Sequence, residues 1–113
     1  MNFNEYQNNA LKTANTEVLT TEQCLMNAAL GLNGEAGEVA DIIKKWQFQG
    51  HEIDRNKITK ELGDILWYVS LGAHACGKTL EEIAEMNIAK LAARYPNGFF
   101  EAERSQNRKE GDI

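Results

Sequence analysis

The chain has 113 residues, a length typical of one domain with a modest hydrophobic core. Its 17 acidic and 12 basic residues give a formal net charge of −5, which argues against a protein that binds nucleic acid by neutralising phosphates. No stretch approaches the roughly 18 apolar residues of a membrane span, and the N-terminal region lacks the features of a signal peptide, so we expect a cytoplasmic protein without a membrane partner.

The single proline, Pro96, and the absence of alternating β-branched runs predict an all-α fold. We expect a helical bundle of four to five helices with an antiparallel central pair. The first helix is predicted at about residues 4–14. Its inward-facing residues are predicted to be Tyr6, Ala10 and either Thr13 or Ala14.

A second predicted helix follows the sequence TTEQ, in which Thr20 and Gln23 have the spacing of a capping box. It runs to about Phe48, and Gly50 is its stop signal. Apolar residues recur along it at spacings of three and four, which predicts one stripe packed against another helix. The stripe consists of Leu25, Ala29, Leu32, Ala36, Val39, Ile43 and Trp46.

Three glycines, Gly31, Gly34 and Gly37, interrupt this helix. Each costs about 1 kcal/mol relative to alanine, so a penalty of about 3 kcal/mol must be offset elsewhere. We expect the glycines to provide clearance, so that a neighbouring helix, another subunit or the phosphates of a substrate can approach the backbone.

A third helix is predicted from the N-cap Asp54 to Gly77, and a fourth from TLEE to the turn YPNG. In TLEE, Thr79 and Glu82 have the spacing of a second capping box. The polar tail, residues 101–113, is expected to be mobile or ordered by a partner, so that residues 1–100 form one domain. The apolar stripe of the third helix consists of Ile58, Leu62, Ile65, Val69, Gly72 and Cys76.

The two cysteines, Cys24 and Cys76, lie within these apolar patterns and have no CxxC spacing. We therefore expect both to be buried free thiols in a protein from a reducing compartment.

Four carboxylates lie directly before apolar positions of the two central helices: Glu35, Glu38, Glu61 and Asp64. If the helices pack antiparallel, both pairs fall on the same side and at similar heights, roughly 15 Å from the connecting loop. Anions that converge in this way raise one another's pKa and favour a bound cation. Oxygen ligands alone indicate Mg²⁺ or Mn²⁺ rather than zinc.

Two other interpretations of these acids remain open. Solvated acidic faces are common in a chain with this many acidic residues. A di-iron centre is weakly supported, because such bundles use Glu-x-x-His and neither His51 nor His74 stands three residues after an acid.

The fourth helix carries a row of polar residues, Asn87, Lys90 and Arg94, next to which stands Tyr95. Such a row is either a solvated face or, beside a metal-carboxylate site, a set of ligands for a polyphosphate chain.

Candidates for contacts with a base are fewer. Trp46 and Trp67 are candidates for stacking, although a tryptophan near an apolar stripe is more often part of the core. Asn27 is a candidate for reading a base edge. Asp41, one turn after Glu38, is a further metal ligand, a partner of a ligand or an exposed acid; the sequence does not decide.

The blocks GEAGEVAD, KELGDILWYVS and NIAKLAARYPNGF, in this order, resemble the ExxE, ExxD and third conserved blocks of MazG-type all-α nucleoside triphosphate pyrophosphohydrolases. The resemblance covers about residues 25–99. It implies a homodimer or a dimer of dimers in which carboxylates hold Mg²⁺ on the triphosphate and water attacks the α-phosphorus, releasing a nucleoside monophosphate and pyrophosphate.

The resemblance also assigns roles to individual residues. The metal ligands would be Glu35, Glu38, Glu61 and Asp64, and Glu35 or Glu38 would also orient or deprotonate the water. The phosphate-binding residues would be Lys90 and Arg94, with Asn87 and Tyr95 beside them.

We therefore expect an enzyme that removes surplus or non-canonical nucleoside triphosphates. Within the same class, phosphoribosyl-ATP or dimeric dUTP hydrolysis is an alternative. A non-catalytic helical module whose acidic groove binds a basic partner is an alternative from a different class.

Overall fold

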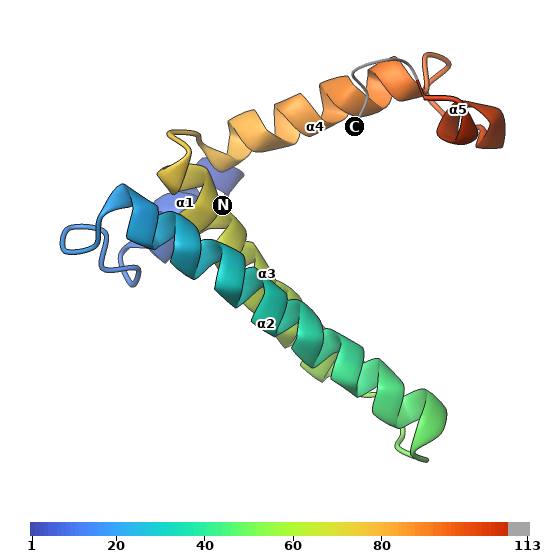
Figure 1. Ribbon diagram of the computed structural model, residues 1–113, viewed down its shortest axis with the longest axis horizontal. Helices are drawn as coiled ribbons and strands as arrows, with labels where there is room; N and C mark the ends of the chain where they lie inside the picture. Colours follow the sequence, from blue (N-terminus) through green and yellow to red (C-terminus); the bar gives the residue numbers. More distant parts are fainter. Residues whose placement is uncertain (109–113) are drawn as a thin grey trace. The chain divides into compact units, whose positions relative to one another are not determined.

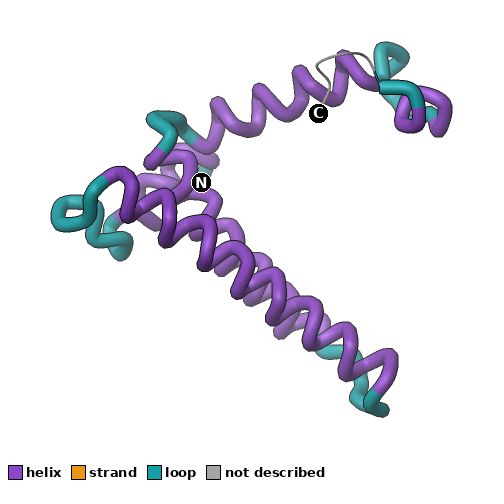
Figure 2. Tube along the Cα trace, viewed as in Figure 1, coloured by secondary structure: helices purple, strands orange, loops and turns teal. Residues whose placement is uncertain are grey.

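The computed structural model describes residues 1–108, and this part of the chain is helical with no strand (Figures 1 and 2). This confirms the predicted all-α class. None of the described helices is long and apolar enough to cross a membrane. The helices are α1 (Phe3–Leu11), α2 (Thr21–Phe48), α3 (Arg55–Ala75), α4 (Leu80–Arg94) and α5 (Ala102–Gln106).

Contacts divide the chain into two compact units, the first of residues 1–80 and the second beginning at Glu81. The first unit is built on α2 and α3, which lie side by side and antiparallel, with α1 packed against α3 (Figure 1). The second unit contains α4 and α5, and the rings of Tyr95 and Phe100 pack there with centroids 5.6 Å apart. The division falls between residues 80 and 81, and the prediction of one domain over residues 1–100 stays a prediction.

Local signals set the helix boundaries of the first unit. The side chain of Thr20 accepts a hydrogen bond from the amide of Gln23, and the side chain of Gln23 accepts one from the amide of Thr20, as the predicted capping box requires. The carboxylate of Asp54 caps α3 by accepting from the amide of Lys57. Gly50 and Gly77 follow the ends of α2 and α3 with φ of 74° and 70°, a conformation that glycine adopts without a steric penalty.

The first helix is shorter than predicted. It ends at Leu11 rather than near Ala14, because the chain turns there and Asn15 adopts a left-handed φ of 56°. Ala10 and Ala14 are buried as expected, whereas Tyr6 is only partly buried.

The sequence did not indicate the role of Gln7, which is buried in α1. Its amide nitrogen donates to the carbonyls of Ser70 and Lys78, and its side-chain oxygen accepts from the amide of Leu80. These bonds fix α1 against the end of α3 and against Leu80, the last residue of the first unit.

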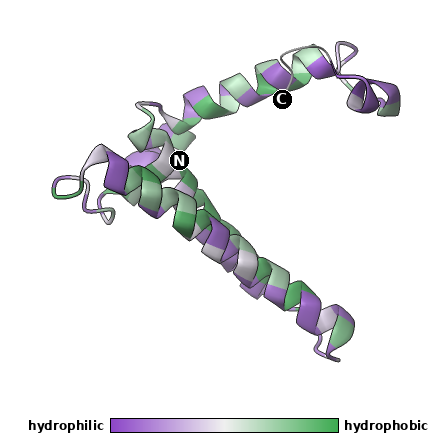
Figure 3. Cartoon of the chain, in the orientation of Figure 1, coloured by the Kyte–Doolittle hydropathy of each residue, from purple (hydrophilic) through white to green (hydrophobic). Residues whose placement is uncertain are grey.

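Apolar residues recur along α2 and α3 (Figure 3), but the predicted stripe of α2 is partly displaced from the actual contact face. On α2, Leu25 is 47% exposed and Ala29 and Ala36 are also exposed, whereas Cys24 and Ala28 are buried. The helices meet through small residues. A Cβ placed on Gly72 of α3 would lie only 3.5 Å from the Cβ of Ala28, and Gly31 lies against the ring of Tyr68.

Most of the predicted stripe of α3 lies on the contact side, since Gly72 faces Ala28 and since Ile58, Ile65 and Val69 are partly buried, but two of its residues do not. Leu62 is 52% exposed, and Cys76 is exposed because it is the C-cap of α3, beyond the last helical residue. The prediction of two buried thiols is therefore right for Cys24 and wrong for Cys76. The core consists of Ala14, Cys24, Ala28 and Leu71, with Leu11, Leu19, Trp67 and Ala75 packed against it.

The predicted tail is described only in part. Residues Ala102–Gln106 form α5. The side-chain amide of Asn97 donates to the carboxylate of Glu101, the residue directly before α5. Residues 109–113 lie outside the described part of the chain.

Candidate functional site

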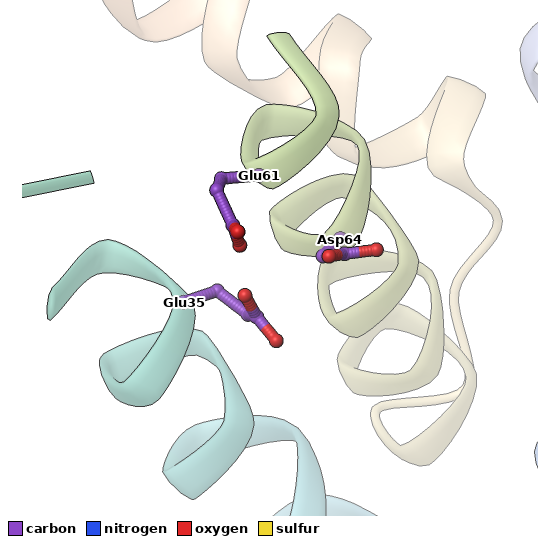
Figure 4. A group of neighbouring side chains, drawn as sticks. All are labelled: Glu35, Glu61 and Asp64. Carbon is purple, nitrogen blue, oxygen red and sulfur yellow. The ribbon is translucent and has the colours of Figure 1, made fainter. Parts of the chain in front are cut away.

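Three carboxylates meet between the two long helices: Glu35 from α2 and Glu61 and Asp64 from α3 (Figure 4). One oxygen of each lies within 4.8 Å of the others. Glu35 and Glu61 are partly buried, and Asp64 is exposed. We call this group the acidic triad.

The seam between the helices explains why Glu35 faces α3. Cys24, Ala28, Gly31 and Glu35 follow one another at spacings of four, three and four residues, which places them on one face of α2. Glu35 therefore continues the contact face instead of flanking it. On α3, Glu61 stands two turns before Tyr68, the residue that meets Gly31, and so projects toward the same helix.

The pKa of Glu35 is raised to about 7. The main cause is its hydrogen bond with Glu61, followed by burial and by the negative charges of Glu61, Asp64 and Glu38. Below about pH 7, therefore, Glu35 holds a proton in its hydrogen bond with Glu61, and a bound cation would replace that proton. The pKa of Tyr6 is also raised, first by burial and then by the charge of Asp64, so α1 borders the same region.

The triad fits a small divalent cation. All its donors are carboxylate oxygens, the ligands that Mg²⁺ and Mn²⁺ prefer. In an octahedral Mg²⁺ site, oxygens on opposite sides are about 4.2 Å apart and adjacent oxygens about 2.9 Å apart, because each Mg–O distance is about 2.0–2.1 Å. The three carboxylate oxygens, which lie within 4.8 Å of one another, would therefore move closer together to bind one ion.

A pocket of about 340 Å³ adjoins the triad and is lined by Glu35, Asp64, Trp67 and Tyr68. The indole nitrogen of Trp67 donates to the carbonyl of Ala10 at 3.2 Å and to the hydroxyl of Thr13 at 3.0 Å. The ring of Tyr68 stands edge-on to Trp67, with centroids 5.0 Å apart and an interplanar angle of 86°. The pocket therefore has an acidic side and an aromatic side.

The fourth predicted ligand, Glu38, is exposed on α2 and is not part of the triad. Its charge is the last of the causes that raise the pKa of Glu35, so it acts on the site electrostatically. Asp41 is ion-paired within its own helix, at 2.8 Å to Lys45 and 3.5 Å to Lys44. The hydrogen bond from Lys45 is the main reason that the pKa of Asp41 is lowered.

Two of the predicted base-contacting residues, Asn27 and Trp46, do not line this pocket. Asn27 is exposed eight residues before Glu35, and Trp46 is 38% exposed eleven residues after it, roughly 16 Å along the helix. The sequence did indicate Trp67 as a candidate, but it gave no sign that Tyr68 borders the acids. The four predicted phosphate ligands lie on α4 or just after it, in the second unit, and their role stays a prediction: Asn87, Lys90, Arg94 and Tyr95.

Comparison with known proteins adds a family match. A family model described as a MazG nucleotide pyrophosphohydrolase domain matches residues 23–99, which include the whole triad. The chain is also 33% identical over 78 residues to the Gene 37 protein of Mycobacterium phage L5, in an alignment that covers 66% of this chain and 68% of that protein. No solved structure matches.

Proposed function

Because the chain belongs to the MazG nucleotide pyrophosphohydrolase family, we propose that it hydrolyses a nucleoside triphosphate between the α- and β-phosphates. The products are a nucleoside or deoxynucleoside monophosphate and pyrophosphate. The substrate is a surplus or non-canonical nucleotide of the cytoplasmic pool, and Mg²⁺ is the cofactor, with Mn²⁺ as a substitute.

The observation that carries this proposal is the acidic triad. Three carboxylates from two helices converge within 4.8 Å inside the region that matches the family. The hydrogen bond to Glu61, then burial and the neighbouring negative charges, raise the pKa of Glu35. A divalent cation would take the place of the proton and relieve the repulsion between the carboxylates.

In this proposal Glu35, Glu61 and Asp64 hold the metal. When bound, the metal neutralises charge that develops on the phosphates and lowers the pKa of a coordinated water. Glu38 lies one turn from Glu35 and outside the triad, so its carboxylate is available to orient the attacking water and accept its proton. Lys90 and Arg94 are proposed to bind the phosphates as fixed cations.

The proposal is tested by incubating the full chain with a panel of nucleoside triphosphates, with Mg²⁺ or with EDTA. We expect a monophosphate and pyrophosphate from some member of the panel, and only with the metal. In ¹⁸O-labelled water the label should appear in the monophosphate, because water attacks the α-phosphorus. A diphosphate and inorganic phosphate as products would contradict the proposed bond cleavage.

Substitutions distinguish a specific role of the triad from a general effect of acidic surface charge. Asp64→Asn and Glu61→Gln should lower kcat/KM by at least about 100-fold, because loss of a group that only supports a ligand already costs 10- to 100-fold. The control is Glu52→Gln, in the exposed loop between α2 and α3, which should keep full activity. A folded protein that binds no metal and is inert across the panel would overturn the proposal.

We also propose a homodimer or a dimer of dimers. Large apolar side chains are exposed on the α2–α3 pair, including Leu25, Met26 and Leu30 on α2 and Leu62 on α3. A second copy would bury such a surface. Light scattering coupled to size-exclusion chromatography tests this, and a monomer at micromolar concentration would refute it.

A further inference from the structure

The acidic triad accounts for only part of the pocket lining. A triphosphate whose metal is held by the triad lies against Glu35 and Asp64, and the lining continues along α3 with Trp67 and Tyr68, three and four residues after Asp64. Ligand pockets commonly combine an apolar or aromatic wall with a few polar groups that fix orientation. The aromatic part of this lining is therefore available to another group of the same ligand.

Trp67 is held rigidly in this wall. Its indole nitrogen donates to both Ala10 and Thr13, at the end of α1 and in the turn that follows. One part of the ring packs against the hydrophobic core, yet the side chain is only partly buried and lines the pocket. The contact of Tyr68 with Gly31 likewise restricts the ring that stands edge-on to Trp67. A surface that is fixed before binding loses little conformational entropy when a ligand stacks on it.

We propose that Trp67 is the residue on which the base of the nucleotide substrate stacks while its phosphates lie at the acidic triad. This inference rests on the proposed function and adds a specificity-determining residue to it. It also distinguishes the two tryptophans, because Trp46 lies roughly 16 Å beyond Glu35 along α2 and does not line the pocket.

The fluorescence of the two tryptophans tests the assignment directly. In Trp46→Phe the remaining indole is Trp67, and in Trp67→Phe it is Trp46. Each full-length variant is titrated, in the presence of Mg²⁺, with a triphosphate that carries a methylene bridge between the α- and β-phosphates and so resists hydrolysis. Inorganic tripolyphosphate, which has the phosphates but no base, is the matched ligand control.

We expect the nucleotide analogue to quench the emission of Trp46→Phe and to leave that of Trp67→Phe unchanged. Tripolyphosphate should compete with the analogue but cause no quenching of its own. A nucleotide that binds without quenching Trp67, or that quenches Trp46 instead, would overturn the assignment.

A second measurement uses affinity. Stacking of a base on an aromatic ring is worth roughly a 10- to 100-fold change in Kd. Calorimetry should show this loss for the nucleotide analogue in Trp67→Leu, with unchanged binding of tripolyphosphate. If this variant does not fold, the fluorescence of Trp46→Phe still decides.

The two proposals fail in different ways. Hydrolysis by the native chain with no response of Trp67 refutes only the stacking assignment. Quenching of Trp67 in a protein that does not hydrolyse any nucleotide supports the assignment and refutes the enzymatic proposal. Absence of both binding and hydrolysis refutes the two together.

Discussion

Replacing Gly31 by alanine should disturb the contact between α2 and α3 at the edge of the acidic pocket. A Cβ at this position would overlap the ring atoms Cδ1, Cε1 and Cζ of Tyr68, closer than real Cβ atoms approach any neighbour. Either Tyr68 must rotate or the two helices must separate. Gly34 lies one turn away in the same helix and has no atom within 4 Å of its added Cβ, so Gly34→Ala is a matched control.

One favourable contribution to the free energy of unfolding is common to both substitutions, and one unfavourable contribution applies to only one of them. Alanine is better than glycine in a helix interior by about 1 kcal/mol, and this gain applies at both positions. Overpacking costs about 1–3 kcal/mol, and this cost applies only at Gly31. The free energy of unfolding of Gly34→Ala should therefore exceed that of Gly31→Ala by about 1–3 kcal/mol.

Urea denaturation of both variants, at one protein concentration, measures this difference. The double variant Gly31→Ala/Tyr68→Ala completes the test, because removal of the ring leaves space for the added methyl group. The two changes should then be non-additive by about 0.5–3 kcal/mol in the stabilising direction. Equal stability of the two alanine variants, or additivity in the double variant, would refute the contact as described.

Three other outcomes are expected. The folded-state pKa of Glu35 is raised from 4.5 to about 7, so between these pH values the metal-free folded chain binds more protons than the unfolded chain. Thermal stability should therefore fall as pH rises through this window, and Glu35→Gln should reduce the slope. A rise of stability with pH in this window would contradict the reasoning. Gln7→Leu removes three hydrogen bonds to the backbone, two of them buried, and should lower the free energy of unfolding by about 1–3 kcal/mol or more. Substitution of the exposed Asn8 by leucine should change it by less than about 0.5 kcal/mol in urea denaturation. A thiol reagent should modify the exposed Cys76 in the native protein and the buried Cys24 only after denaturation, and equal rates would refute the assigned burial.

The helix boundaries could be predicted because the signals that set them are local. A capping box needs only Thr20 and Gln23 three residues apart, and a left-handed glycine ends a helix wherever it stands. Gln7 could not be predicted in the same way. Its partners lie 63 to 73 residues further along the chain, so its burial depends on tertiary packing alone.

The contact face of α2 was harder to predict than the helix itself. Hydrophobicity selected Leu25 as part of the contact stripe of α2, whereas the closest contacts use Ala28 and Gly31. Small residues contribute little to a hydrophobic pattern, yet they let two helices approach closely. The large apolar side chains at neighbouring positions then remain exposed and can contact the surface of another protein chain.

The candidate site was predicted in part, but the structure gives a different reason for the position of Glu35. Glu35, Glu61 and Asp64 do converge, but Glu35 does so because it continues the small-residue seam. Glu38, one turn later, is exposed and stays outside the triad. The glycines divide similarly: Gly31 makes room for Tyr68, whereas Gly34 has open space around it.

The position of the triad links metal binding to the stability of the α2–α3 pair. The buried residues of α2 precede Glu35, and those of α3 follow Asp64, so residues 29–69 contain no buried side chain. Beyond the triad the pair has apolar residues that are only partly buried, such as Val39, Ile42 and Ile58. At the boundary between the two halves, the hydrogen bond of Glu35 to Glu61, then burial and the negative charges of the neighbouring acids raise the pKa of Glu35. A cation bound there would attract all three carboxylates, and at 100 times its Kd it would add about 2.7 kcal/mol to the free energy of unfolding. The proposed catalytic metal would thus also join the two long helices at the point where full burial of their side chains ends.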